Sequence, residues 1–82
     1  MRITFNELAE RELNDAARYY ELEQAGLGAA FITEVLRCSE AIAESPEAGP
    51  AVLRAVRRRL CQRFPYGLLN TVAGSELRIS RS

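Results

Sequence analysis

A short segment rich in proline and other turn residues, from Pro46 to Pro50, divides this 82-residue sequence into two parts with different hydrophobic periods. Before this segment, apolar residues recur at every third or fourth position, which is the spacing of an amphipathic helix. After it, apolar and polar residues alternate, which is the spacing of a β-strand. The sequence therefore predicts an α+β protein with its helices in the first half and most of its strands in the second.

The first half predicts one short strand followed by a helical hairpin. Residues 2–5 alternate apolar and polar side chains, and Asn6 is a suitable N-cap for the helix that follows. The turn Gly26-Leu27-Gly28 ends this helix and starts a second one. The second helix should end near Ser45, because Pro46 disfavours helical backbone at the residue before it. Its inner stripe consists of Phe31, Val35, Cys38 and Ile42.

The second half predicts a three-stranded antiparallel meander whose twisted sheet packs on the helices. Alternation from residue 56 to residue 64 predicts a strand with two different faces. Val56, Leu60 and Phe64 share one face with Arg58 and Gln62, and Arg57, Arg59, Cys61 and Arg63 share the other. We expect the first face to contact the core and the arginine face to meet solvent or a target. Pro65-Tyr66-Gly67 interrupts the chain before strands at 68–72 and 76–79, which a turn at 73–75 joins.

The formal net charge of zero hides two strongly charged halves. Residues 1–50 contain four arginines and ten acidic residues, whereas residues 51–82 contain seven arginines and one acidic residue, Glu76. Such a split indicates that the basic half contacts an acidic or polyanionic partner. All the basic side chains are arginines, which bind carboxylates and phosphates with two parallel hydrogen bonds but cannot serve as proton-transfer bases.

Composition argues against several other kinds of function. The sequence has no histidine, and Cys38 and Cys61 lack the spacing of metal ligands, so we expect two buried free thiols, no metal site and no cofactor. The N-terminus lacks a secretion signal, and no apolar run approaches the roughly 20 residues of a membrane span. These features predict a cytoplasmic protein with no membrane partner.

Several short motifs occur in an order that resembles a known family. They are Glu12, Leu13, Ala16, Ala17, Tyr19 and Tyr20 in the first helix, Gly26-Leu27-Gly28 with Phe31, Glu44-Ser45-Pro46, the arginine strand, and Arg63-Phe64-Pro65-Tyr66-Gly67-Leu68-Leu69. Over roughly residues 1–79 this order resembles the RelE/ParE superfamily, the toxins of bacterial type II toxin–antitoxin modules. The resemblance implies a helical hairpin on a twisted antiparallel sheet, a role in plasmid stabilisation, and neutralisation by an antitoxin protein that wraps the toxin.

The sequence departs from the family pattern at two places. Asn70 stands where family members commonly have an aromatic residue. After a strand like Glu76–Ile79, the family usually continues through a stretch with valine, histidine and arginines and then a tail, whereas this sequence ends at Ser82. We therefore interpret residues 1–82 as a single RelE/ParE toxin-like domain without the usual C-terminal extension. Such a domain should expose a sheet edge, through which a homo-oligomer can form.

The resemblance leaves the cellular target open. In the RelE branch, basic residues of the sheet cleave messenger RNA on the ribosome together with arginine and tyrosine from the C-terminal region, which makes Arg59, Arg63 and Arg78 the catalytic candidates. Arginine stays protonated, and Tyr66 beside Pro65 is interpreted as a core or turn residue, so ribonuclease activity is not expected. The ParE branch poisons DNA gyrase by binding, and we favour this function. A third alternative is a degenerate member that binds only an antitoxin.

The binding surface is predicted to involve Arg57, Arg58, Arg59, Arg63 and Arg78. Antitoxins of this class present an acidic, amphipathic segment that is disordered until it binds, and an arginine surface beside apolar residues suits such a segment. The alternative is that these arginines form only a solvated strand face.

Overall fold

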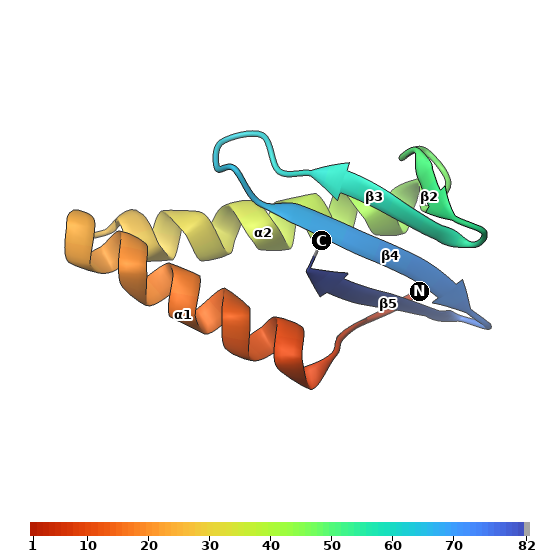
Figure 1. Ribbon diagram of the computed structural model, residues 1–82, viewed down its shortest axis with the longest axis horizontal. Helices are drawn as coiled ribbons and strands as arrows, with labels where there is room; N and C mark the ends of the chain where they lie inside the picture. Colours follow the sequence, from red (N-terminus) through yellow and green to blue (C-terminus); the bar gives the residue numbers. More distant parts are fainter. Residues whose placement is uncertain (82) are drawn as a thin grey trace.

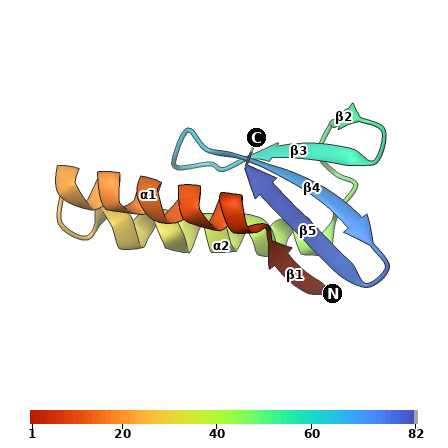
Figure 2. The same cartoon turned by 60° about the horizontal axis from the view of Figure 1, so that its bottom comes forward.

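The structure, a computed structural model, describes residues 1–81 and has two helices on one side of a five-stranded sheet (Figures 1 and 2). The elements are β1 (Arg2–Phe5), α1 (Glu7–Glu23), α2 (Leu27–Glu44), β2 (Ala51–Leu53), β3 (Val56–Leu60), β4 (Gly67–Ala73) and β5 (Glu76–Arg81). The predicted α+β class, the helical hairpin and the meander of β3, β4 and β5 are confirmed. The short strand β2 was not predicted. Within the described residues, neither helix is long and apolar enough to cross a membrane.

The strand order in the sheet is β1-β5-β4-β3-β2, so the first and last strands of the chain are neighbours. β1 is parallel to β5, whereas the other neighbouring strands are antiparallel. A parallel pair requires a long crossover, and here the helical hairpin and the meander separate its two strands in the sequence. The edges of the sheet are β1 and β2 (Figure 2).

The predicted cap and the predicted glycine turn both shape the helical hairpin. The side chain of Asn6 accepts a hydrogen bond of 2.7 Å from the backbone N–H of Ala9, which satisfies a free donor of the first turn. Gly26 has a φ of 88°, a left-handed conformation that glycine adopts without strain. At Gly28 a Cβ atom would lie 2.5 Å from the carbonyl oxygen of Ala17. The second glycine therefore lets the two helices approach closely.

The core lies between the helices and the sheet and is centred on Phe31. The centroid of its ring lies 5.1 Å from that of Tyr20, 5.2 Å from that of Phe64 and 5.0 Å from that of Tyr66. The predicted inner stripe of α2 is buried, as are Leu68, Leu77 and Ile79 from the sheet. Tyr66 is also buried, so its interpretation as a core residue is confirmed.

The structure corrects the predicted orientation of β3. Arg57 is paired with Asn70 and Arg59 with Leu68, and both of these partners are buried on the side of the sheet that faces the helices. Paired residues in antiparallel strands point to the same face, so Arg57 and Arg59 also point toward the helices. Leu60 ends the strand earlier than predicted and is 60% exposed. Val56 and Leu60 of the predicted apolar face thus point to the open side, because pairing with β4 rather than local alternation sets the register. Phe64, which lies beyond the end of the strand, is buried in the core as predicted.

Both cysteines are free and buried, as predicted. They are also neighbours in the core, one from α2 and one directly after β3. Hydrogen bonding between the two thiols lowers the pKa of Cys38 and, together with burial, raises the pKa of Cys61. The two thiols therefore contact each other where α2 packs against the sheet.

Candidate functional site

Both helices lie on one side of the sheet and leave its other surface uncovered (Figures 1 and 2). Arg78 is paired with Thr4 on one side and with Thr71 on the other, and Leu69 is paired with Arg58 and Ser80. These pairings place three hydroxyl groups and two arginines on one surface, here called the open face. Its residues are Thr4, Arg58, Leu69, Thr71, Arg78 and Ser80.

A cavity of about 390 Å³ indents the open face. Its lining combines hydroxyl groups with apolar side chains and one arginine. The lining residues are Thr4, Asn6, Val56, Leu69, Asn70, Thr71, Arg78, Ile79 and Ser80. A volume of this size is in the range of pockets that bind small molecules or the side chains of a partner. The open face therefore offers a concave surface with a positive group.

Glu76 fixes the orientation of Arg78 on this face. Oε1 of Glu76 accepts a hydrogen bond of 2.7 Å from Nε of Arg78, and Oε2 accepts bonds of 2.7 Å from Arg2 and 3.1 Å from Thr4. These bonds, from Arg78 first and then from Arg2 and Thr4, lower the pKa of Glu76 to about 2. The carboxylate of Glu76 bonds only to Nε of Arg78. Within residues 1–81, the two terminal nitrogens of the Arg78 guanidinium therefore have no protein partner.

Arg57 and Arg59 have a different environment at the end of α2. Nη1 of Arg57 donates a hydrogen bond of 2.9 Å to the carbonyl oxygen of Gly49, and Nη2 of Arg59 donates one of 2.8 Å to that of Ser45. Ser45 is the C-cap of α2, where carbonyl groups lack partners within the helix and positive charge is favourable. These two arginines therefore hold the segment after α2 against β3.

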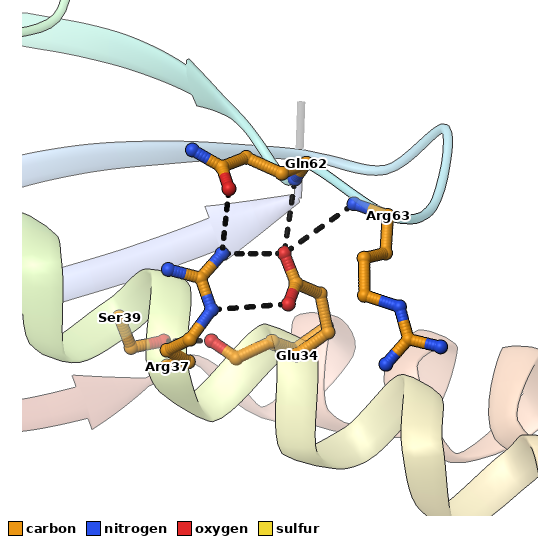
Figure 3. A network of polar contacts seen from close by, with 6 residues as sticks. Glu34, Arg37, Ser39, Gln62 and Arg63 are labelled. Atoms are coloured by element: carbon orange, nitrogen blue, oxygen red, sulfur yellow. Dashed lines mark hydrogen bonds and ion pairs between the residues drawn. The ribbon is translucent and has the colours of Figure 1, made fainter.

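A buried carboxylate, Glu34 of α2, anchors the loop that carries Arg63 (Figure 3). Its side chain is 4% exposed and accepts hydrogen bonds of 2.7 and 3.1 Å from the guanidinium of Arg37. It also accepts bonds of 3.0 Å from the backbone N–H of Gln62 and 3.4 Å from that of Arg63. These four residues, here called the Glu34 cluster, connect α2 to the loop between β3 and β4.

The donors of the Glu34 cluster strongly favour the ionised form of Glu34. The hydrogen bonds from Arg37 are the largest cause that lowers the pKa of Glu34 to about 2, and the two backbone donors act in the same direction against the cost of burial. The side chain of Arg63 is exposed, and its Cζ atom lies 5.8 Å from the centroid of the Phe64 ring. The cluster thus fixes the backbone of Arg63 and leaves its guanidinium at the surface.

Sequence reasoning missed Glu34 as a structural residue. A glutamate followed by arginine three residues later resembles an ordinary surface ion pair of a helix. The available signal was position, because Glu34 lies three residues after Phe31 and directly before Val35, on the inner stripe of α2. A carboxylate at a buried position requires several hydrogen-bond donors, and two of them come from a distant loop.

The five arginines that were predicted to share a surface occupy three places. Arg58 and Arg78 lie on the open face, Arg57 and Arg59 lie at the end of α2, and Arg63 lies in the loop between β3 and β4. Among the described residues, only Arg78 of these five forms an ion pair with a carboxylate. The structure therefore separates the predicted binding residues into two pairs and one single residue, and only the pair of Arg58 and Arg78 lies on the open face.

Within residues 1–81, the open face has donors for anionic groups but no group suited to proton transfer near neutral pH. The carboxylate beside Arg78 on this face, Glu76, has a pKa lowered to about 2 and stays deprotonated near neutral pH. Tyr20 and Tyr66 pack in the core on the other side of the sheet. Within residues 1–81, no group of three or more cysteine, aspartate or glutamate side chains is positioned to hold a metal ion. This face can bind an acidic partner or a phosphate by electrostatic attraction.

A comparison with solved structures finds the same fold in another protein. The chain superposes with a TM-score of 0.81 on a chain of the structure described as "Chromosomal ParDE TA system from P. aeruginosa". The match covers 99% of this chain and 95% of that chain, with 18% sequence identity. No protein-family model matches the sequence, and no curated protein matches it either. The comparison shows a shared fold over nearly the whole length of both chains.

Proposed function

We propose that this chain is the toxin of a type II toxin–antitoxin module and that an acidic antitoxin neutralises it in the bacterial cytoplasm. The observation that carries this proposal is the full-length fold shared with a chain of a ParDE system, at a TM-score of 0.81. The motif order of the RelE/ParE superfamily and the excess of arginine in residues 51–82 support it independently. An acidic partner complements that basic half.

We propose further that the chain acts by binding its target, as the ParE branch does with DNA gyrase. The arrangement of the arginines supports binding over cleavage. Arg59, Arg63 and Arg78 were the catalytic candidates, but they lie at the end of α2, in a loop and on the open face, respectively. General acid–base catalysis requires a proton-transfer group within hydrogen-bond reach of the substrate, and the residues of the open face that the structure describes include none near neutral pH.

Cleavage of messenger RNA, as in the RelE branch, is the second candidate. Arg58 and Arg78 lie on the same concave face as the hydroxyl groups of Thr4, Thr71 and Ser80. Positive charge and hydroxyl donors are the groups that proteins use to hold the phosphates of a single strand. This observation favours a face that contacts RNA, with electrostatic stabilisation as its contribution to cleavage.

Expression of the chain alone in bacterial cells separates these functions. We expect growth arrest, relaxed plasmid DNA and intact messenger RNA, and we expect co-expression of a small acidic protein encoded beside the toxin to restore growth. Cleavage of messages only during translation, with normal supercoiling, would support the RNase candidate. Unchanged growth together with binding of the acidic protein would indicate a degenerate member, and unchanged growth without binding would contradict the toxin proposal.

Purified DNA gyrase provides the direct test of the target. We expect the chain to inhibit supercoiling, and we expect Arg58→Gln combined with Arg78→Gln to weaken inhibition. Arg18→Gln is the matched control, because Arg18 is an exposed arginine on α1, away from the open face. Full supercoiling activity at a large excess of the folded chain would contradict a gyrase target and leave the antitoxin part of the proposal unaffected.

A further inference from the structure

The outer edge of β2 has no partner strand and is flanked by apolar side chains. β2 is the last strand in the sheet order, and all three of its residues are exposed. Val52 is 51% exposed and Leu53 is 67% exposed, and Leu60 at the end of the neighbouring strand is 60% exposed. Exposed edges with apolar side chains are sites where another chain can add a strand.

The backbone of Ala51 is directed outward from this edge. The N–H of Arg58 donates a hydrogen bond of 3.1 Å to the carbonyl oxygen of Pro50, and Ala51 is paired with Arg57. Hydrogen-bonding groups alternate between the two sides of a strand, so the N–H and C=O of Ala51 point away from β3. These two groups are available to a further strand.

A cavity of about 440 Å³ lies beside the same edge. It is lined by residues 48–50 and by Val52, Arg58, Arg59 and Leu60. At Gly49 a Cβ atom would lie 2.5 Å from the carbonyl oxygen of Arg58, so glycine lets this segment approach β3 closely. The cavity can therefore take an apolar side chain from a strand bound along β2.

The positive charge around the edge of β2 favours an acidic partner. The hairpin of β2 and β3 contains Arg54, Arg57, Arg58 and Arg59 and no acidic residue, and within residues 1–81 none of these arginines pairs with a carboxylate. Arg54, in the turn, and Arg58 are both exposed. A second copy of the chain paired at the same edge would bring like charges together. An acidic segment would instead have its charge balanced.

We propose that the edge of β2 binds an extended acidic segment of a partner protein, which adds to the sheet as a sixth strand. Its backbone pairs with Ala51, one of its apolar side chains enters the cavity beside Val52 and Leu60, and its carboxylates contact Arg54 and Arg58. The inference rests on the proposed function for the biological identity of the partner, the antitoxin. Its chemical description rests on the edge, the cavity and the charges of this chain.

A short peptide of alternating glutamate and valine is the probe for this site, and a peptide of alternating lysine and valine is its control. We expect the acidic peptide alone to bind, to shift the amide NMR signals of β2 and to slow hydrogen exchange at Ala51. We expect Arg54→Gln with Arg58→Gln to weaken binding at least about fivefold and to flatten its salt dependence. Arg11→Gln with Arg18→Gln, two exposed arginines of α1, should leave binding unchanged.

Ala51→Pro tests the strand addition itself, because proline removes the outward N–H and leaves the hydrogen bonds between β2 and β3 in place. We expect the variant to keep its circular dichroism spectrum and to lose most of its affinity for the peptide. If the variant unfolds, the NMR shifts of the wild-type chain still decide where the peptide binds. Signals that move on the open face or on α1 in place of β2 would overturn the proposal.

Two further results keep this inference separate from the proposed function. Sedimentation of the isolated chain tests whether a second copy occupies the edge. A dimer that persists in Arg54→Gln with Arg58→Gln but dissociates in Ala51→Pro would identify a second copy as the occupant and overturn the proposal of an acidic partner. An acidic antitoxin that binds the wild type and both edge variants equally would overturn the edge inference while the toxin function stands. Peptide binding at β2 by a chain that causes no growth arrest would support the edge inference and contradict the toxin function.

Discussion

The two sides of the sheet use arginine and glutamate for different purposes. On the side that faces the helices, Arg59 bonds to a carbonyl oxygen at the end of α2, and Glu34 binds two backbone N–H groups of a distant loop. On the open face, Glu76 is bonded only by side chains, from Arg78, Arg2 and Thr4. The bonds of Arg59 and Glu34 hold backbone segments against α2, whereas the bonds of Glu76 link side chains of the neighbouring strands β1 and β5 and orient Arg78. The comparison indicates that charge stabilises the fold on one side and is available for binding on the other.

A matched pair of leucines tests this difference most strongly. Leu77 in β5 is fully buried against the helices, and Leu60 in β3 is 60% exposed on the open side. We expect Leu77→Ala to lower the free energy of unfolding by about 2–5 kcal/mol, because it leaves a cavity in the core. Leu60→Ala should change it by less than about 0.5 kcal/mol. Urea denaturation of both variants measures these values, and equal losses would contradict the assignment of the two faces.

The two glutamates provide the next largest contrast. Glu34→Gln places an amide NH₂ among the donors of Arg37 and Gln62 in a buried position, so we expect the melting temperature to fall by several degrees. Glu76→Gln removes bonds at a more exposed carboxylate and should have a smaller effect on melting. Thermal denaturation followed by circular dichroism compares the two. A larger loss for Glu76→Gln would show that the open face also stabilises the fold.

Acid should act through the same two carboxylates. The pKa of Glu34 and that of Glu76 are lowered from 4.5 to about 2 in the folded chain, so the unfolded chain binds more protons between these values. Stability is therefore fully present above about pH 4.5 and is lost as the pH falls toward about 2. We expect melting temperatures to decline over this window and to decline less steeply in Glu34→Gln. A variant with the wild-type slope would contradict the role of the Glu34 cluster.

Neighbouring arginines of β3 should give the smallest contrast in stability. Arg59→Gln removes a hydrogen bond to the C-cap of α2 and should cost about 0.5–1 kcal/mol. Arg58→Gln changes an exposed side chain of the open face and should cost less than about 0.5 kcal/mol. We expect the reverse order for affinity toward an acidic peptide, since Arg58 is the exposed one. Affinity that depends on Arg59 more than on Arg58 would show that the end of α2 also contacts the partner.

Much of the fold was predictable because its signals are local. The helical period identified the inner stripe of α2, and Asn6 and Gly26 determine the start of α1 and the turn after it through their own backbone and side-chain preferences. The hairpin of β4 and β5 was recognisable from two apolar strands around a glycine turn. β2 was missed because three residues after a proline carry too little periodic signal to distinguish a strand from a loop.

The candidate site was less predictable because it depends on contacts between distant segments. The sequence by itself determined the α+β class, the helical hairpin and the concentration of arginine in the second half, since these follow from period, caps and composition. Only the tertiary structure decided which arginines face outward. Pairing of Arg57 with Asn70 and of Arg59 with Leu68 sets the register, and a shift by one residue reverses every side chain of a strand. The burial of Leu68 in the core settles that choice, and no pattern within β3 contains this information.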